Sequence, residues 1–461
     1  MRILSEVGVK VRNRRAIDFF ASVGCKTADG RVVIPESAVT RAISQTAKQV
    51  PFVASAGEHS FTVDAGSDGI SYGTGGQALY VLRRREGKFL RSSADGNDLR
   101  EILQLCEGLQ NVDFITRPVE PDVDAENMDA EKARIFAANT SKPMNLANLV
   151  KPEKLDEVVE IIGGRDLLSF IACLVVSPLS IDDGAADKLM TIVEHDIPIS
   201  ISSCAQGGTT APLSELGELS QLNAEVLAGF VLANAVKPGA KVLYRGIPIT
   251  SDLMKDGSPR WCQPDSIRRL ALAARMSRSY GIPCCGTAAV SDEKEPSAQG
   301  IAEKTLSWIF EGAAGAHYIN SALGMLEQVL TVSPEQYVID DIILGQIKEG
   351  LSGTSPEDLQ VFAAASAERA LSTFGVKVDD DIRREIGSRI DFIYDKKEQY
   401  TEENAEKQFE AVRKACTSSM GSNVFMKGSR RGLREGVLYQ GKRIEGDLDF
   451  SVVDAVLAGS K

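Results

Sequence analysis

The amino-acid sequence predicts an α/β protein built on a (β/α)8 TIM barrel. Eight short apolar, β-rich runs recur at spacings of about 25 to 45 residues, and helical patterns lie between them. Strands that are apolar on both faces and alternate with helices are typical of a parallel sheet covered by helices. Eight such units are the number that closes a barrel. No GxGxxG follows the first strand, so a doubly wound dinucleotide-binding fold is the weaker alternative.

The eight expected strands are followed along the chain by helical patterns such as DLREILQLCEGL and NAEVLAGFVLANAV. In chain order the strands are expected at 70–76, 112–118, 143–149, 170–178, 197–203, 241–248, 282–289 and 317–323. The predicted barrel spans residues 66–350. Residues 1–65 are expected to form an N-terminal α+β attachment. Residues 351–461 are charged and helical, and this C-terminal extension is expected to end in a basic turn, GSRRGLREG, and a hairpin.

Composition excludes several classes of protein. The chain of 461 residues has a net charge of -12, which argues against a phosphate-binding surface and against nucleic acid as a partner. The eight cysteines show no CxxC spacing, as expected in a reducing cytoplasm. The sequence contains no run of about 18 uncharged apolar residues, so it predicts no membrane-spanning segment. We therefore expect a cytoplasmic protein, and a homo-oligomer if the helical extension joins copies of the chain.

Polar side chains stand at the ends of the expected strands, where the active site of such a barrel lies. Any one of them could be an ordinary strand-end residue, but as a set they predict a binding pocket. The candidate site residues are Tyr72, Thr74, Gln77, Arg117, Asn145, Asn148, Gln206, Tyr244, Arg245, Thr287, Asn320, Glu327 and Gln328, with Glu120, Ser202 and Ser203 beside them.

The three histidines, His59, His195 and His317, are predicted to be structural. The first precedes a strand, the second ends a helix and the third begins the last strand, away from the expected mouth. No Ser-His-Asp arrangement can therefore be built at the strand ends.

A zinc site at the cysteines is a further alternative. Cys284, Cys285 and Cys204 could supply three thiolates and leave an open catalytic position, as in zinc-dependent thiol methyltransferases. Neighbouring residues of one strand, however, point to opposite faces of the sheet. We therefore predict that the pair packs in the core and that the chain binds no metal.

Several motifs, in this order, resemble the trimethylamine methyltransferase superfamily. They are EVGVKV, GTGGQA, VDF, KPMNLAN, GTAAVSD and GMLEQVLTVSPEQYVIDDII. The resemblance implies a (β/α)8 barrel that moves a methyl group from a methylated amine to the cobalt of a corrinoid. This cobalamin-type cofactor would be carried by a separate corrinoid protein, so the chain itself would bind none.

The loop after the eighth strand separates two branches of that superfamily. Trimethylamine enzymes carry pyrrolysine there, and the local match of GMLEQVLT places it at or beside Gln328. Glutamine has no electrophilic imine, so the chain resembles the non-pyrrolysine branch, which implies quaternary amines such as glycine betaine, proline betaine or carnitine. A Gly-Gly-rich segment with His-Thr, frequent near the C-terminus of members, has no counterpart here. A non-catalytic binding protein for a quaternary amine is therefore a second alternative.

The chemistry that the resemblance implies fits a mouth without a catalytic histidine. A quaternary ammonium leaves as a neutral amine and needs no general acid, so the enzyme positions and desolvates its substrate. Tyr72 and Tyr244 are expected to hold the cation by their ring faces, with Glu327 as the countercharge. Arg117 or Arg245 is suited to bind the carboxylate of a betaine.

Overall fold

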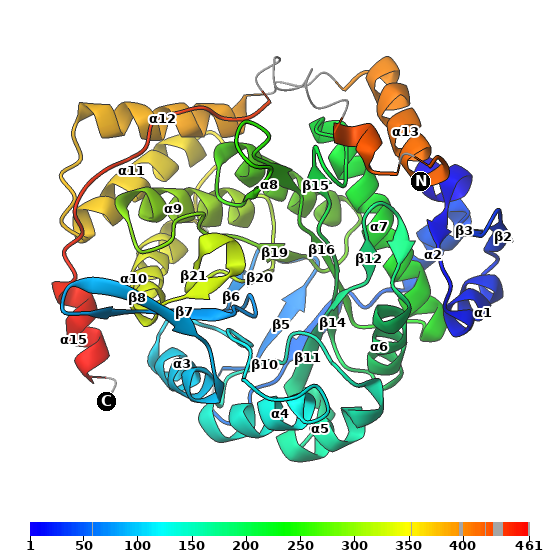
Figure 1. The fold of residues 1–461 in the computed structure, drawn as a ribbon, viewed down its shortest axis with the longest axis horizontal. Helices are drawn as coiled ribbons and strands as arrows, with labels where there is room; N and C mark the ends of the chain where they lie inside the picture. The colour runs from blue at the N-terminus through cyan, green and yellow to red at the C-terminus, as the bar shows by residue number, and fades with distance from the viewer. Residues whose placement is uncertain (58, 352, 396–399, 420, 427–436, 460–461) are drawn as a thin grey trace.

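The computed structural model describes residues 1–461 except 58, 352, 396–399, 420, 427–436 and 460–461. Within the described part, helices surround a ring of short parallel strands (Figure 1). The predicted α/β class is confirmed.

Eight parallel strands form a closed cycle of pairings, which we call the strand ring. Its members are β6 (Ser71–Tyr72), β9 (Ile115–Thr116), β10 (Met144–Asn145), β11 (Leu168–Cys173), β14 (Ile199–Ser203), β16 (Val242–Gly246), β19 (Cys285–Thr287) and β20 (Tyr318–Asn320). Parallel ladders join β9, β10, β11, β14 and β16 in this order, and join β19 to β20 and β20 to β6. Single parallel bridges close the two remaining joints, Gly73 to Phe114 and Tyr244 to Cys284. The predicted neighbours, 70–76 and 317–323, are paired through Tyr318 and Ser71.

A helix follows every strand of the ring. These helices are α3 (Gly96–Gly108), α4 (Met128–Asn139), α5 (Leu155–Ile162), α6 (Asp183–Glu194), α7 (Glu215–Val236), α8 (Pro264–Ser279), α9 (Ala298–Ala313) and α10 (Pro334–Leu351), with the short 3-10 helices η2 (Pro152–Lys154) and η3 (Arg165–Leu167) beside α5. Local sequence explains where several begin. Asp95 forms a capping box with Asp98 at α3, and Ser214 and Ser297 accept backbone N–H groups at α7 and α9.

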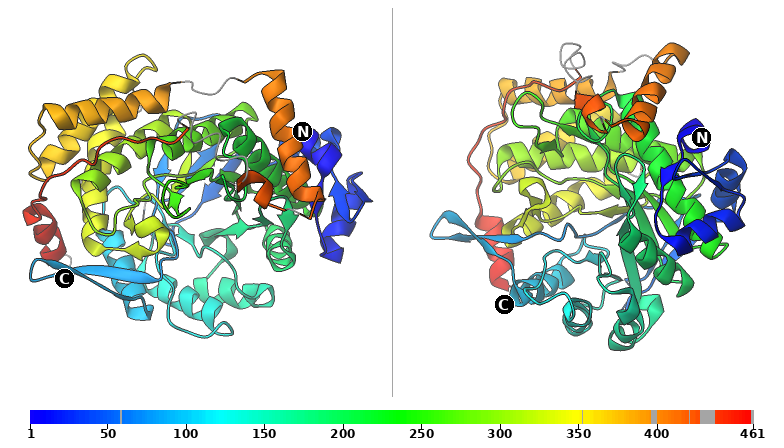
Figure 2. Two further views of the ribbon diagram at one scale, coloured as in Figure 1. Left: turned by 45° about the horizontal axis from the view of Figure 1, so that its top comes forward. Right: turned by 45° about the vertical axis from the view of Figure 1, so that its right-hand side comes forward.

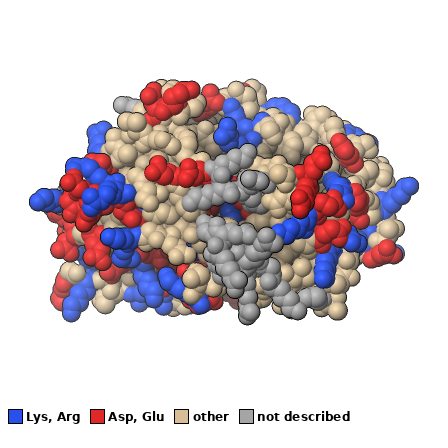
Figure 3. All heavy atoms as spheres, turned by 90° about the horizontal axis from the view of Figure 1, so that it is seen from above, with Lys and Arg blue, Asp and Glu red and all other residues tan. Residues whose placement is uncertain are grey.

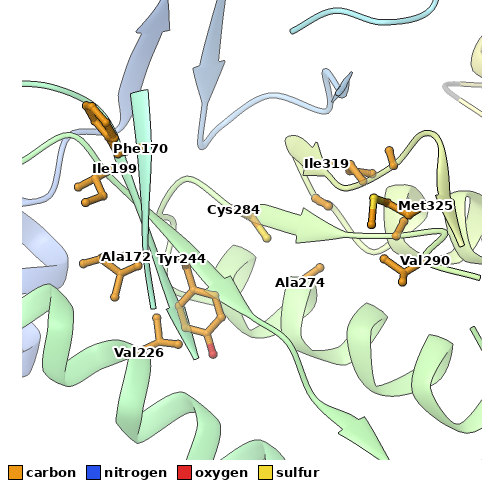
Figure 4. Close-up of a cluster of buried hydrophobic side chains, with 14 of the residues drawn as sticks. Phe170, Ala172, Ile199, Val226, Tyr244, Ala274, Cys284, Val290, Ile319 and Met325 are labelled. Atoms are coloured by element: carbon orange, nitrogen blue, oxygen red, sulfur yellow. The ribbon is translucent and has the colours of Figure 1, made fainter. Parts of the chain in front are cut away.

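Strand register decides which side chains face the inside of the ring. Residues paired across parallel strands point the same way, and the next residue points the other way. Cys173, Ser202 and Arg245 form one inward row. Tyr244 lies on the opposite face and extends from β16 toward Val226 of α7 (Figure 4). The main hydrophobic core therefore lies between the strand ring and its helices.

An aromatic plug closes the amino-terminal end of the ring. The hairpin of β4 (Gln49–Phe52) and β5 (Phe61–Asp64) packs there against Phe114, Leu243 and Tyr318. The ring centroids of Phe52 and Tyr318 are 4.6 Å apart, and those of Phe114 and Tyr318 are 3.7 Å apart. Because apolar side chains fill this end, a ligand can enter only from the carboxyl ends of the strands.

The N-terminal segment covers the outer face of α7 (Figures 1 and 2). It consists of η1 (Ile3–Val7), β1 (Val9–Lys10), α1 (Arg14–Ser22), β2 (Lys26–Ala28), β3 (Arg31–Val33) and α2 (Glu36–Gln45). Strand β1 pairs with β13 (Ser180–Ile181), and β13 pairs in turn with β12 (Val175–Val176). By length and composition α7 could cross a membrane, with a mean hydropathy of 1.3. However, 78% of this stretch is buried inside the protein. The high hydropathy of α7 is that of a core helix, most of whose residues are buried.

The C-terminal segment adds α11 (Leu359–Thr373), α12 (Asp380–Tyr394), α13 (Glu402–Thr417) and α15 (Ser451–Gly459). The prediction of a hairpin near the C-terminus is wrong. Residues 437–450 contain no strand and run as an extended segment past α12 to the start of α15 (Figures 1 and 2). Side chains of the protein satisfy its backbone instead: Glu385 accepts the N–H of Lys442 and Gln299 accepts that of Ile444. The expected basic turn, GSRRGLREG, lies outside the described residues.

Two small sheets flank the carboxyl end of the ring. In one, β21 (Met325–Leu326), β22 (Thr331–Val332), β7 (Tyr80–Arg85) and β8 (Lys88–Ser93) are neighbours in this order. In the other, β15 (Gln206–Gly207), β17 (Ile249–Ser251) and β18 (Pro259–Arg260) are neighbours. The first sheet ties the loop after β20 to the long β7–β8 hairpin.

Truncation of the plug should destabilise the fold. Phe52→Ala removes a ring that is 4% exposed, and a substitution of this kind costs about 3–4 kcal/mol in free energy of unfolding. Urea unfolding followed by circular dichroism measures the loss. Leu90→Ala is the control, since Leu90 is 56% exposed and should change stability by less than about 0.5 kcal/mol. A loss below about 1 kcal/mol for Phe52→Ala would show that the hairpin does not seal the ring.

Candidate functional site

Backbone strain gathers at the carboxyl end of the strand ring. Gln77, Ala147, Ala289 and Ser321 follow β6, β10, β19 and β20, and their φ angles are 55°, 58°, 59° and 62°. A non-glycine residue in the left-handed region costs about 1–3 kcal/mol and persists only where its surroundings fix it. Four such positions at one end of the ring indicate that this end is the functional one.

The loop after β20 contains three left-handed residues in succession, within the short 3-10 helix η4 (Glu327–Val329). The φ angles of Glu327, Gln328 and Val329 are 48°, 58° and 71°. The backbone N–H of Glu327 donates to Glu293 O at 2.8 Å, and that of Gln328 donates to Ser291 O at 3.1 Å. Since Glu293 and Ser291 follow β19, the neighbouring loop holds this turn in place. We call η4 the strained turn.

The carboxylate of Glu327, expected as the countercharge of a bound cation, already has a cationic partner within the protein. Arg91 Nη1 lies 2.6 Å from Glu327 Oε2, and Thr331 Oγ1 donates to the same oxygen at 2.7 Å. Burial acts to raise the pKa of Glu327, but the hydrogen bonds from Thr331 and Arg91 outweigh it and lower the pKa. Arg91 also stacks on the ring of Tyr80, 4.3 Å from its centroid. The pair anchors the strained turn to the β7–β8 hairpin.

The two tyrosines expected to bind a cation do not face the inside of the ring. Tyr244 pairs in register with Ile201, and its hydroxyl donates to Asn223 Oδ1 of α7 at 3.2 Å. Tyr72 pairs in register with Ile319 and likewise faces the surrounding helices. Lys348 Nζ of α10 lies 5.2 Å from the centroid of the Tyr72 ring. Both rings belong to the core, and this part of the prediction is wrong because the strand alternation points them outward.

Arg117 joins three segments of the rim instead of lining the interior. Its Nη2 donates to Gln77 Oε1 at 2.7 Å and to Asn148 Oδ1 at 3.0 Å, and it forms an ion pair with Glu120. The side chain is fully buried, and desolvation lowers its pKa. Nε and Nη1 of Arg117 have no hydrogen-bond partner among the described residues. The structure thus brings Gln77, Arg117, Glu120 and Asn148 together as a clamp between β6, β9 and β10.

Three further candidates form a polar layer above the aromatic plug. Asn145 Nδ2 donates to the hydroxyl of Tyr318 at 3.2 Å, and Asn320 Nδ2 donates to Thr116 Oγ1 at 2.6 Å. Thr74 Oγ1 donates to Thr116 O, also at 2.6 Å. These contacts hold the strand ends in register. Gln206, in contrast, lies farther out, where its Nε2 donates to Gly257 O at 3.3 Å.

Arg245 and Thr287 face the interior of the ring, and each has a polar atom without a hydrogen-bond partner among the described residues. Arg245 is 7% exposed, and its Nη1 donates to Ser202 Oγ at 3.1 Å. Its Nε has no hydrogen-bond partner among the described residues, and the same holds for the buried Thr287 Oγ1. Ser203, whose side chain alternates outward, bonds to Glu225 on α7. Of the candidate residues that face the interior, Arg245 and Thr287 are therefore the pair with polar atoms still free for a ligand.

Solvent reaches the carboxyl end of the ring at Cys173, which was not among the predicted site residues, and at Cys204, which was considered only as a zinc ligand. Cys173 and Cys204 are exposed, although Cys173 lies in the inward row with Ser202 and Arg245. Desolvation nevertheless raises the pKa of Cys204 to about 12, and the nearby Cys173 thiol adds to the shift. Because Cys173 faces the inside of the ring and is nevertheless exposed, the ring is open to solvent beside it. We call the space beside Cys173, Cys204 and Arg245 the inner hollow.

A surface hollow of about 460 Å³ lies elsewhere on the protein. Met1, Asn223, Glu406 and Phe409 are among its lining residues, which come from the N-terminal segment, α7 and α13. None of its lining residues belongs to the strand ring. The strain and the open polar atoms favour the inner hollow as the site.

The structure gives no support to the zinc alternative. Cys284 packs in the core outside the ring, whereas Cys285 contacts the aromatic plug inside it. In the part of the chain that the structure describes, no three His, Cys, Asp or Glu side chains are grouped to hold a metal. His195 caps α6, as predicted, with Nδ1 at 2.7 Å from Thr191 O.

Comparison with known proteins gives consistent matches. Residues 1–374 match the model of the family described as trimethylamine methyltransferase (MTTB). Trimethylamine methyltransferase MttB of Methanosarcina barkeri is 30% identical over 378 residues, which cover 78% of this chain and 75% of that protein. Glycine betaine methyltransferase of Desulfitobacterium hafniense (strain Y51) is 25% identical over 375 residues, with 78% and 77% covered.

Among solved structures, the monomethylamine methyltransferase MtmB of Methanosarcina barkeri is similar at a TM-score of 0.46 and 12% identity. The match covers 94% of this chain and 90% of that one. At this TM-score the likeness is too distant to support a conclusion about fold or function.

The inner hollow predicts which thiols react in the native protein. A small neutral alkylating reagent should label Cys173 and Cys204 before the buried Cys284 and Cys285, as peptide mass mapping would measure. Because the pKa of Cys204 is about 12, its labelling should still rise with each pH unit above pH 9, where an ordinary thiol levels off. Early labelling of Cys284 or Cys285 would contradict the placement of the hollow.

Proposed function

Because the chain belongs to the trimethylamine methyltransferase family, we propose that it moves a methyl group from a methylated amine to the cobalt of a corrinoid on a separate protein. The observation that carries this proposal is the strained turn at the carboxyl end of the strand ring. By its resemblance to the family, Gln328 stands at or beside the place of pyrrolysine in trimethylamine enzymes. A glutamine there favours quaternary amines as donors.

The pairing pattern supports a finer statement about the fold. We infer that the strand ring is a complete (β/α)8 barrel, because its eight parallel strands pair in a cycle and a helix follows each one. In such a barrel the loops after the strands form the active site. The strained turn, the rim clamp at Arg117 and the inner hollow all lie at that end.

The proposed reaction assigns to this chain positioning and the exclusion of water. The methyl carbon passes to cobalt(I) of the partner's corrinoid, which is the second substrate, while the C–N electron pair stays on nitrogen. A quaternary donor then leaves as a neutral tertiary amine, so no proton has to be supplied. This accounts for a site with buried hydroxyl, amide and guanidinium groups and no histidine.

The partner and the cellular setting are part of the same proposal. A corrinoid protein would dock over the carboxyl end of the ring, since the plug closes the other end. The eight cysteines, which form no disulfide in the described structure, fit a cytoplasmic protein. Acidic and basic side chains are intermixed on both flanks of the face in Figure 3, whereas Lys and Arg dominate a surface that binds nucleic acid.

Methyl transfer should be directly observable. The purified chain is mixed with a corrinoid protein reduced to cobalt(I) and with one methylated amine at a time, and the absorbance of the corrinoid is followed. We expect methyl-cobalt to form with quaternary ammonium donors and hardly at all with trimethylamine. A donor that binds in calorimetry but leaves cobalt(I) unchanged would support the binding-protein alternative.

Gln328→Gly separates the strain of the turn from the function of its side chain. Glycine accepts a φ of 58°, so the free energy of unfolding should rise by about 0.5–1 kcal/mol. The rate of methyl transfer should fall about tenfold or more if the side chain positions the donor. Glu86→Gly is the matched control, because Glu86 has a φ of 50° in the exposed β7–β8 turn. That variant should gain stability and keep its rate; an unchanged rate in Gln328→Gly would remove Gln328 from the site.

A further inference from the structure

We propose that Arg443 and Asp454 are positioning residues for the strained turn and act on it through two other parts of the protein. Both belong to residues 437–459, which we call the C-terminal tail. The inference rests on the proposed function, in which Gln328 of the strained turn positions the methyl donor. It adds to that function a structural requirement outside residues 1–374, the part of the chain that matches the family model.

The strained turn is held between two elements. On one side, its backbone N–H groups donate to the carbonyl oxygens of Ser291 and Glu293 in the β19–α9 loop. On the other side, the carboxylate of Glu327 binds Arg91 of the β7–β8 hairpin. We call the β19–α9 loop and the β7–β8 hairpin the two supports of the turn. Because the turn bonds to both, movement of either support would change its position.

Arg443 binds the side chain of a residue whose carbonyl oxygen holds the turn. Its Nη1 donates to Glu293 Oε1 at 2.6 Å, and its Nη2 forms an ion pair with Glu293 Oε2. Ser297 Oγ, at the start of α9, donates to the same Oε2 at 2.7 Å. A two-point contact between an arginine and a carboxylate fixes direction as well as distance. The first support is therefore tied to the C-terminal tail.

Asp454 ties the second support to the tail. Both of its carboxylate oxygens accept hydrogen bonds from Arg84 Nη1 of β7, at 2.8 and 3.0 Å. The Arg84 guanidinium also stacks on the ring of Phe450, 4.5 Å from its centroid. That ring lies 5.7 Å from the ring of Phe89 on β8. Helix α15 accordingly lies beside the β7–β8 hairpin (Figures 1 and 2).

The tail can hold the two supports because it is itself attached to the protein along its length. Gln299 Oε1 accepts the N–H of Ile444 at 2.8 Å, and the N–H of Asp449 donates to Phe374 O at 2.9 Å. Ile444 is 2% exposed, and Val453 of α15 is fully buried. The stretch between the two ion pairs thus lies at a fixed place, and each support is held against it.

The strained turn needs such support because its conformation is unfavourable. Three non-glycine residues in succession have φ angles of 48°, 58° and 71°. A left-handed conformation of this kind persists only where the surrounding structure fixes it. If either support moved, the turn would relax and the side chain of Gln328 would leave its position.

Hydrogen exchange tests the inference without a donor or a corrinoid. The backbone N–H groups of Glu327 and Gln328 are hydrogen-bonded, so their exchange measures how often the turn opens. Exchange of the full chain is followed by mass spectrometry on peptides that cover 324–332. Arg443→Met should raise the exchange rate of these peptides about fivefold, and Asp454→Asn should raise it about two- to fivefold.

Three further variants show whether the effect comes from the contact itself. Arg443→Lys keeps the charge and one donor, so exchange should return toward the wild-type rate. Arg413→Met is the matched control, because the exposed ion pair of Arg413 is with Glu410 of its own helix, α13. It should leave exchange of the turn unchanged. If Arg443 acts through Glu293, Arg443→Met should add little to the effect of Glu293→Gln in a double variant.

Methyl transfer to a reduced corrinoid protein then separates positioning from stability. Arg443→Met should lower kcat about tenfold, because the side chain of Gln328 is displaced. The KM for the amine should change by less than about twofold, since the tail does not line the inner hollow. Arg443→Lys should recover most of kcat, and Arg413→Met should keep it. Thermal melts show whether each variant is folded.

Three outcomes would overturn the inference. They are unchanged exchange of the turn in both Arg443→Met and Asp454→Asn, faster exchange spread evenly over the whole protein, and an unchanged kcat in variants whose turn exchanges faster. Failure of the proposed function looks different, because the wild-type chain would then methylate no cobalt although the variants still differed in exchange of the turn.

Discussion

The alternation of side chains along the paired parallel strands is the constraint on which the rest of the structure depends. Because the period is two, one register assigns every strand residue either to the helices or to the interior. Residues such as Tyr244 and Ile201 then build the outer core, and Ser202 and Arg245 line the interior. The aromatic plug fills the amino-terminal half, so the carboxyl half alone is left for polar groups and for a ligand.

That same alternation explains how far the sequence could be interpreted. The positions of the strands could be predicted, because apolar, β-rich runs separated by helices are a strong pattern. The direction of each side chain could not, since both faces of these strands are buried and carry apolar residues. Tyr72 and Tyr244 were therefore expected in the mouth, whereas they pack against helices. Arg245, at the next position, does face inward.

Contacts between segments far apart in the sequence were the second feature that could not be predicted. Nothing near Glu327 in the sequence shows that Arg91, 236 residues away, neutralises its carboxylate. The left-handed backbone conformation of the three residues in the strained turn could not be predicted either, because none of them is a glycine. Buried polar contacts compensate for the strain: Asp340 accepts Gly324 N at 2.7 Å and Lys304 Nζ at 2.8 Å, just before the turn begins. The turn is thus fixed by the tertiary structure.

The claim that the inner hollow is the donor site is tested most directly by substrate protection of its thiols. The alkylation rates of Cys173 and Cys204 would be measured with and without a saturating quaternary ammonium donor, with the partly buried Cys416 as an internal reference. A donor bound beside Cys173 and Cys204 should slow the alkylation of both thiols and leave the alkylation of Cys416 unchanged. Equal rates with and without a donor that calorimetry shows to be bound would contradict it.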